Sequence, residues 1–230
     1  MNHSLLVLWD IDGTLLVSDR NGTEPYDRAI HALHPDAQVE LIPTHGMTDC
    51  QATALYLKAA NLELTEIPLV LEQLDIQSAE YLTDKARIAP LAGVDEALAR
   101  VASRGFTNGL LTGNTPARAI NKLTGSGMDT GLICWEQSFF GATAALRSDV
   151  TQRARIRFPD RPIVIIGDTP LDGQAAVGAG IEFIGVTTGA YGAEALREAG
   201  ASSVVDDLVT GLDEIDEVLQ RFASRGTEFE

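Results

Sequence analysis

The sequence predicts an α/β protein whose parallel sheet is interrupted by an all-helical insert. Two short apolar runs, 5–9 and 163–166, are typical of strands buried on both faces of a sheet, and an aspartate follows each within two residues. From residue 87 onward, expected strands alternate with expected helices, which is the pattern of parallel strands joined by right-handed crossovers. Residues 17–86 have helical spacing without a convincing strand. We therefore expect a Rossmann-like core formed by 1–16 and 87–230, and a helical domain formed by 17–86.

Local signals define the individual elements. Apolar residues at helical spacing predict the helices of the insert, and a threonine followed three residues later by a glutamine marks a helix start at Thr48. Glycine or proline bounds several of the core helices. The expected helices are 24–33, one from Thr48, one within 66–87, 94–104, 116–124, 151–158, 171–179, 194–199 and 208–222. The expected strands are 5–9, 106–112, 132–135, 162–166, 182–186 and 203–205.

Composition and charge narrow the classes of partner. The chain of 230 residues carries a formal net charge of -16, which disfavours nucleic acid and anionic membranes as partners. No apolar stretch approaches the ~20 residues of a membrane-spanning helix. Cys50 and Cys134 have the spacing of neither a disulfide framework nor a metal site, so we read them as reduced thiols of a cytoplasmic protein. We expect a monomer or homodimer that acts on a small molecule.

Two pairs of aspartates follow the two buried strands. Asp10 and Asp12 are separated by one residue, so their side chains point to the same side of an extended backbone. Asp168 and Asp172 follow the second strand at the start of a helix. Ligands of open α/β sheets bind at the carboxyl ends of the strands, and Mg²⁺ prefers carboxylate oxygens. The pairs therefore indicate a metal site. The alternatives are a simple Asp-Gly turn at residue 12 and an Asp172 that complements a helix dipole.

A third strand ends in a hydroxyl group. Thr112, Gly113 and Asn114 precede a helix that Pro116 opens. A hydroxyl and free backbone N–H groups at a helix N-terminus can hold an anion such as phosphate. A helix cap without a ligand explains the same residues equally well.

Together these motifs resemble the haloacid dehalogenase superfamily, in its phosphatase branch with a helical cap inserted after the first motif. Residues 10–14 match the first motif of that family, Thr112 the second, and Gly167-Asp168 with Asp172 the fourth. Their order and wide separation match as well, so the resemblance covers essentially the whole chain. The loop 45–49 is similar to the cap loop of phosphoglycolate-phosphatase-like members.

The resemblance implies a role for each aspartate. Asp10 is expected to be the nucleophile and a Mg²⁺ ligand. Asp12 is expected to be the general acid and base, and its backbone carbonyl a metal ligand. Asp168 is expected to bind the metal directly, and Asp172 to support the site from behind it.

Phosphate contacts are expected from Thr112, Gly113, Asn114 and Arg147. The family usually has a lysine between its second and fourth motifs. We assign none of the three lysines, Lys58, Lys85 and Lys122, to that position, and expect Arg147, just before a helix, to replace it. In the cap, the expected substrate-reading residues are Arg20 and Thr48.

The resemblance therefore implies a Mg²⁺-dependent phosphatase that hydrolyses a small phosphate monoester, such as a phosphoglycolate-like one, through an aspartyl-phosphate. Two alternatives remain at this point. A phosphomutase of the same superfamily would use the same residues, and a non-catalytic phosphate-binding protein would explain the missing lysine.

Overall fold

A parallel sheet forms the centre of the molecule. The computed structural model describes residues 4–18, 24–84 and 87–225. Within these residues, six strands pair in the order β5-β4-β1-β6-β7-β8, and every pairing between them is parallel. The strands are β1 (Leu6–Trp9), β4 (Thr107–Thr112), β5 (Phe139–Phe140), β6 (Ile163–Gly167), β7 (Glu182–Val186) and β8 (Ser203–Val205). Because β1, β4 and β6 are neighbours, the motifs that follow these three strands meet at one edge of the sheet.

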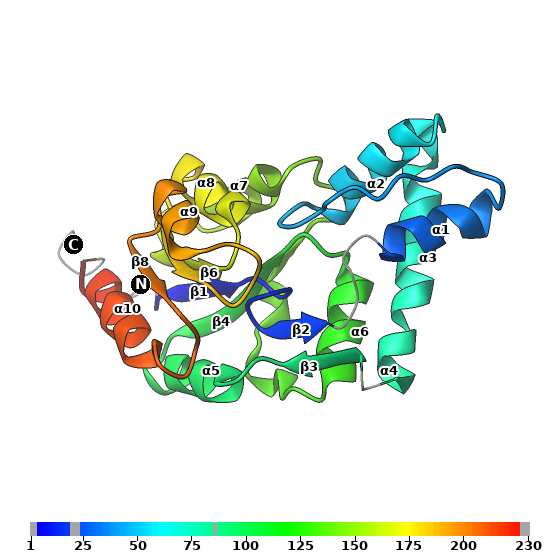
Figure 1. The fold of residues 1–230 in the computed structure, drawn as a ribbon. Coiled ribbons are helices and arrows are strands. Elements are labelled where there is room, and N and C mark those ends of the chain that lie inside the picture. Colours follow the sequence, from blue (N-terminus) through cyan, green and yellow to red (C-terminus); the bar gives the residue numbers. More distant parts are fainter. Residues whose placement is uncertain (1–3, 19–23, 85–86, 226–230) are drawn as a thin grey trace.

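Helices cover both faces of this sheet (Figure 1). Along β1 the side chains alternate between two apolar clusters, with Leu6 and Leu8 in one and Val7 and Trp9 in the other. The first cluster packs against α7 (Arg147–Arg157), α8 (Pro170–Gly178) and α9 (Ala193–Glu198). The second packs against α5 (Val94–Ser103), α6 (Pro116–Ser126) and α10 (Leu212–Arg225). No described helix is long and apolar enough to cross a membrane.

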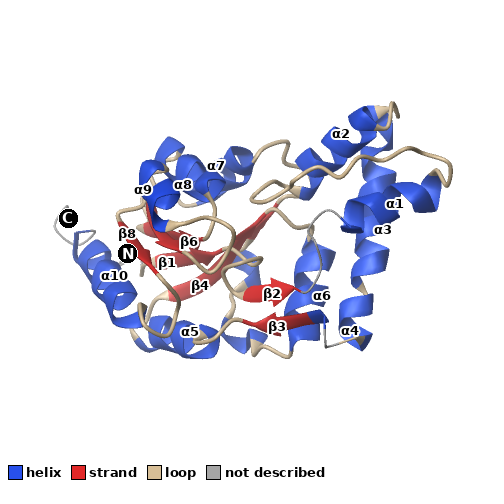
Figure 2. Ribbon diagram, viewed as in Figure 1, coloured by secondary structure: helices blue, strands red, loops and turns tan. Residues whose placement is uncertain are grey.

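Four helices form the helical insertion, which lies at the end of the molecule away from the chain termini (Figure 1). They are α1 (Glu24–Leu33), α2 (Asp49–Ala59), α3 (Ile67–Ser78) and α4 (Glu80–Thr83). The first three share an apolar core of their own, centred on Tyr26, Tyr56 and Leu74. A two-stranded antiparallel ribbon of β2 (Leu16–Ser18) and β3 (Ile88–Pro90) connects the insertion to the sheet (Figure 2).

The predicted fold class is confirmed, and one strand prediction is wrong. Residues 132–135 do not form a strand. The chain there makes two short 3₁₀ turns, Thr130–Leu132 and Trp135–Gln137, and only Ile133 bridges to β4. The edge strand is instead β5, two residues whose pairing with β4 no local pattern distinguishes from a loop.

Two helices begin four residues away from the expected start, each for a local reason. Helix α7 begins at Arg147 rather than at residue 151, because the Asp149 carboxylate accepts the backbone N–H of Leu146 and closes the first turn. Helix α10 begins at Leu212 rather than at residue 208, because Asp207 accepts N–H groups from the next residues and holds them in a turn. The ribbon of β2 and β3 spans the expected junction between core and insert, where no strand was expected.

Candidate active site

Three buried carboxylates meet at the carboxyl edge of the sheet. Asp10 follows β1 and Asp168 follows the adjacent β6. Asp172 lies in the first turn of α8, where Oδ2 accepts the backbone N–H and the hydroxyl of Thr169. One carboxylate oxygen from each of the three aspartates lies within 4.8 Å of the other two, and all three residues are buried. The sheet thus brings together acids that are more than 150 positions apart in the sequence, as the strand-end argument predicted.

The charge of this group is incompletely compensated. Burial raises the pKa of Asp10 to about 7, although the Arg147 guanidinium works in the opposite direction. Burial, followed by the negative charges of Asp10 and Asp172, raises the pKa of Asp168 well above its usual range. Gly13, at φ +85°, passes so close to the Asp168 carboxylate that a Cβ would collide with it. Carboxylate oxygens that converge in a tight glycine-lined cradle and lack a full countercharge fit a divalent cation.

Arg147 supplies one positive charge to the same group. Its Nη2 lies 2.7 Å from Asp10 Oδ1, 2.5 Å from Asp172 Oδ1 and 2.7 Å from the Leu111 carbonyl oxygen. The residue is only 3% exposed. Burial alone would lower the pKa of Arg147, but the Asp172 and Asp10 carboxylates outweigh this and raise it, so the guanidinium stays charged. The structure thus places Arg147 in the site, as expected, although it is the first residue of α7 rather than a loop residue.

Asp12 differs from the other aspartates, because its side chain is 46% exposed and pairs with a lysine. Lys122 Nζ lies 2.8 and 2.6 Å from the two carboxylate oxygens of Asp12. Asn114 Nδ2 donates a third hydrogen bond to Asp12, at 2.8 Å. Burial works to raise the pKa of Asp12, but the Lys122 charge and the Asn114 hydrogen bond prevail, so the pKa is lowered.

The prediction that no lysine between the second and fourth motifs contributes to the site was wrong for Lys122. Lys122 lies between Thr112 and Asp168 in the chain, and its side chain reaches the site from α6. The available signal was its position on the face of α6 that carries the apolar residues Ala119 and Leu123. A cation on the apolar face of an amphipathic helix is unusual unless it is paired.

The second motif contacts both the support of Asp12 and the helical insertion. Thr112, fully buried, ends β4, and its Oγ1 accepts a hydrogen bond from Asn114 Nδ2 at 2.8 Å. Gly113 packs against the carbonyl of Met47 in the helical insertion, and its backbone oxygen accepts the N–H of Asp49 at 2.7 Å. A side chain at position 113 would push the insertion away from the sheet.

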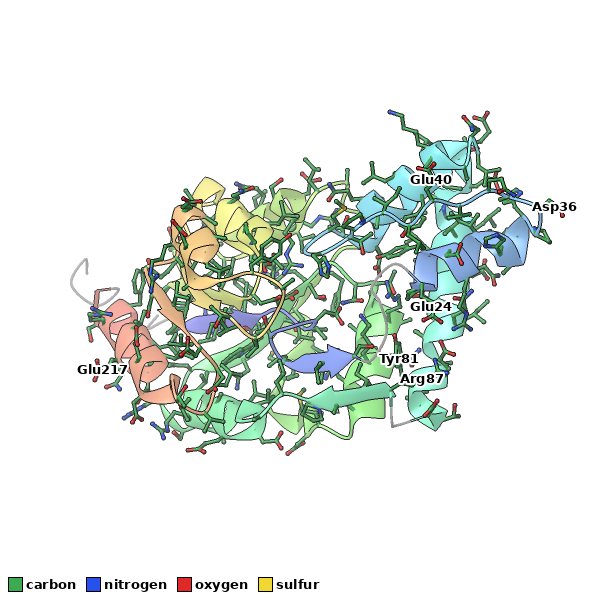
Figure 3. The ribbon with its side chains drawn as sticks, in the orientation of Figure 1. Glu24, Asp36, Glu40, Tyr81, Arg87 and Glu217 are labelled. Carbon is green, nitrogen blue, oxygen red and sulfur yellow. The ribbon has the colours of Figure 1, made fainter. Side chains whose placement is uncertain are left out.

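These groups open into one cavity of about 270 Å³. Its floor is formed by Asp10, Asp12 and Asp168 of the core, and residues of the insertion such as His45 and Tyr81 form part of its wall. Figure 3 shows Tyr81 at the junction of the insertion with β3 and α6. The cavity therefore lies between the core and the helical insertion, and has room for a small molecule.

A buried ion pair joins the insertion to the core beside this cavity. Arg118 of α6 donates to the carboxylate of Asp49, the first residue of α2. The same carboxylate accepts the Tyr26 hydroxyl at 2.7 Å and the backbone N–H of Thr115 at 2.7 Å. Arg118 also lies over the Tyr26 ring, with Cζ 5.6 Å from the centroid. Sequence reasoning missed this cluster, because its members come from three separate helices.

Asp49→Ala is expected to lower the free energy of unfolding by about 3–5 kcal/mol, since it leaves the Arg118 guanidinium buried without its carboxylate. Denaturant unfolding followed by circular dichroism measures this change. Asp36→Ala, at an exposed position of the insertion, is the matched control and should change the free energy by less than about 0.5 kcal/mol. A loss for Asp49→Ala no larger than that of the control would contradict a stabilising role for the pair.

The structure places only one of the two residues that were expected to contact the substrate from the cap. Thr48 is fully buried and does not line the cavity. Its hydroxyl donates to the Ala144 carbonyl oxygen at 2.6 Å and accepts the N–H of Gln51, so it caps α2 and ties it to the core. Arg20 lies outside the described residues.

The chain resembles known proteins in both sequence and fold. The family described as haloacid dehalogenase-like hydrolase matches residues 7–186. A search of curated proteins gave no match. A hydrolase from Pseudomonas syringae has a TM-score of 0.70 at 21% identity, with 94% of this chain and 99% of that chain covered.

Two further solved structures share the fold. A candidate beta-phosphoglucomutase from Bacteroides vulgatus has a TM-score of 0.70 at 19% identity, over 96% of this chain and 91% of that chain. A predicted phosphoglycolate phosphatase from Haemophilus somnus has a TM-score of 0.63 at 19% identity, over 94% and 99% of the respective chains. The family match spans most of the chain and includes the strands that carry Asp10, Thr112 and Asp168, so the chain belongs to the haloacid dehalogenase-like hydrolases.

Proposed function

We propose that this protein is a Mg²⁺-dependent phosphatase that hydrolyses a small phosphate monoester through a phosphorylated Asp10. The observation that carries the proposal is the arrangement of the acids. Asp10, Asp168 and Asp172 form a buried group suited to a divalent cation, while Asp12 stands beside them with an exposed carboxylate. The carboxylate for proton transfer is thus separate from, and adjacent to, the group that would bind the metal and supply the nucleophile.

The reaction consists of two displacements at phosphorus. In the first, a carboxylate oxygen of Asp10 forms a bond to phosphorus, the bond to the leaving oxygen breaks, and Asp12 gives that oxygen its proton. In the second, Asp12 removes a proton from water, the water oxygen bonds to phosphorus, and Asp10 is released together with inorganic phosphate. Mg²⁺, held by Asp10 and Asp168 with Asp172 behind them, would offset the negative charge of the phosphoryl group.

The phosphoryl oxygens would be held by groups around Asp10. Thr112 offers its hydroxyl, and Gly113 offers its backbone N–H just before α6. The backbone N–H of Asn114 instead donates to Thr112 Oγ1 at 3.2 Å and helps to orient that hydroxyl. Arg147 contributes a charge that is already fixed against Asp10. These donors are in place before the reaction and would stabilise the charge of the transition state electrostatically. Such stabilisation is the main contribution of the protein to phosphoryl transfer.

The helical insertion, expected at 17–86, would act as a cap that selects the leaving group. Its residues close one side of a cavity of about 270 Å³, which favours a small metabolite over a polymer. A phosphoglycolate-like substrate fits this volume, and one of the structures that share the fold is described as a predicted phosphoglycolate phosphatase.

The decisive experiment measures phosphate release from a panel of small phosphate monoesters that includes 2-phosphoglycolate, with Mg²⁺ and with chelator. We expect release that requires Mg²⁺ and a best substrate of few carbon atoms. Absence of release from every ester would count against the proposal. A phosphomutase would instead move the phosphoryl group to a sugar hydroxyl, and a parallel assay of sugar-phosphate isomerisation detects that outcome. The non-catalytic alternative predicts no release from any ester, and the pairing of Lys122 with Asp12 and of Arg147 with Asp10 favours catalysis over it.

A further inference from the structure

We propose that Lys122 is a positioning residue that, together with Asn114, fixes the carboxylate of Asp12 for proton transfer to the leaving group. The inference deepens the proposed function and depends on it. It concerns a residue of α6, about two turns into the helix, whose ammonium group contacts the Asp12 carboxylate.

Each of the three N–H donors of the Lys122 ammonium group has an acceptor. An ammonium group has three N–H donors. The three acceptors around Nζ are Asp12 Oδ1 at 2.8 Å, Asp12 Oδ2 at 2.6 Å and Asn114 Oδ1 at 2.9 Å. The side chain is only 6% exposed. No donor is left over for a substrate, so Lys122 acts on the reaction through Asp12 and not by binding the ester itself.

Asn114 completes the support of Asp12. Its Oδ1 accepts from Lys122, which fixes the orientation of the amide. Its Nδ2 then donates to Asp12 Oδ2 and to Thr112 Oγ1, both at 2.8 Å. The amide thus links the proton-transfer carboxylate to the hydroxyl expected at the phosphoryl group.

This support matters because the Asp12 carboxylate would otherwise be free to rotate. Its side chain is 46% exposed, and the described residues place no other side-chain donor on it. A carboxylate has about four lone-pair positions. Lys122 and Asn114 occupy three of them, one on Oδ1 and two on Oδ2. The remaining position, on Oδ1, is where Asp12 would hold the proton for the leaving oxygen.

The neighbouring cation on the same helix has a different task. Arg118 lies one turn before Lys122, but its carboxylate partner is Asp49 of the helical insertion. Arg118 therefore holds the insertion, while Lys122 holds a reacting group. The contrast supports a specific role for Lys122 rather than a general need for positive charge on α6.

Lys122→Met tests the proposal through its dependence on the leaving group. The leaving group of an alkyl phosphate such as 2-phosphoglycolate is a strongly basic alkoxide, which needs a proton as it departs. The leaving group of 4-nitrophenyl phosphate is a stable phenolate, which does not. We expect Lys122→Met to lower kcat/KM by about 10- to 100-fold for the alkyl ester, part of the range that general acid catalysis supplies, and by less than about 3-fold for the nitrophenyl ester. The exposed Lys58→Met is the matched control and should change neither value.

A double-mutant cycle with Asp12→Asn separates positioning from substrate binding. If Lys122 acts through Asp12, adding Lys122→Met to Asp12→Asn costs nothing further in kcat/KM. Equal losses for both esters, or losses that multiply in the double variant, would overturn the proposal. So would a rise in KM for phosphoglycolate alone with kcat unchanged, because that result marks a substrate-binding lysine.

Folding and the proposed function are checked independently. Thermal unfolding shows whether Lys122→Met is folded, and Lys122→Gln, which keeps one donor for Asp12, should show the same leaving-group pattern with a smaller loss. An Asp10→Asn variant that releases phosphate as fast as the wild type would refute the proposed function itself. Normal Asp10 dependence with no leaving-group effect of Lys122→Met would refute only the positioning role.

Discussion

Asp10→Asn is expected to reduce phosphate release by about four orders of magnitude or more, the scale seen when an enzyme loses its nucleophile. The amide has the size of the carboxylate but cannot attack phosphorus. Steady-state release from the best ester of the panel, in saturating Mg²⁺, measures the effect. Asp36→Asn, an exposed change of the same kind, should retain full activity.

The same variant should not unfold more easily than the wild type. Burial raises the pKa of Asp10 from 3.8 to about 7 in the folded, metal-free protein. The ionisation of Asp10 therefore costs folding free energy increasingly between these two pH values, and the full cost is present above about pH 7. Replacing it with a neutral amide removes this cost, so at pH 8 without metal the melting temperature should stay equal or rise. Lost activity with an undiminished melting temperature identifies a chemical role. Full turnover by Asp10→Asn would refute the proposed nucleophile.

Arg147→Met is expected to lower both stability and turnover. The guanidinium bridges Asp10, Asp172 and the Leu111 carbonyl while being 3% exposed. Without it the three buried carboxylates keep no cationic side chain in direct contact among the described residues. Breaking a buried ion pair in this way costs about 3–5 kcal/mol. Denaturant unfolding without metal measures the loss, and Mg²⁺ should restore part of it by supplying positive charge.

Two further variants make the test of Arg147 specific. Arg147→Lys keeps the charge but not the planar fork, so its losses should be smaller than those of methionine. Arg153→Met removes a cation from the exposed side of the same helix and should leave stability and turnover near wild type. If Arg147→Met were as stable and active as Arg153→Met, the guanidinium would not be part of the site.

The sequence by itself determined the fold class and the positions of the acids proposed to take part in the reaction. Strands that are buried on both faces need continuous apolar runs, and the functional groups of a parallel sheet follow the strands directly. Asp10, Asp12, Thr112 and Asp168 could therefore be found from local pattern alone. The resemblance to haloacid dehalogenases is confirmed for the same reason, because its motifs are short segments at strand ends.

Only the tertiary structure decided which distant side chains complete the site. Lys122 and Arg118 lie on one face of α6, and their partners, Asp12 and Asp49, are 110 and 69 positions away. Such contacts depend on the rotation of α6 about its axis and on how the helical insertion docks on the sheet. The free energy that fixes both comes from packing between elements, so no local pattern encodes it. For the same reason the two-residue strand β5, which is defined by its pairing with β4, was not predicted.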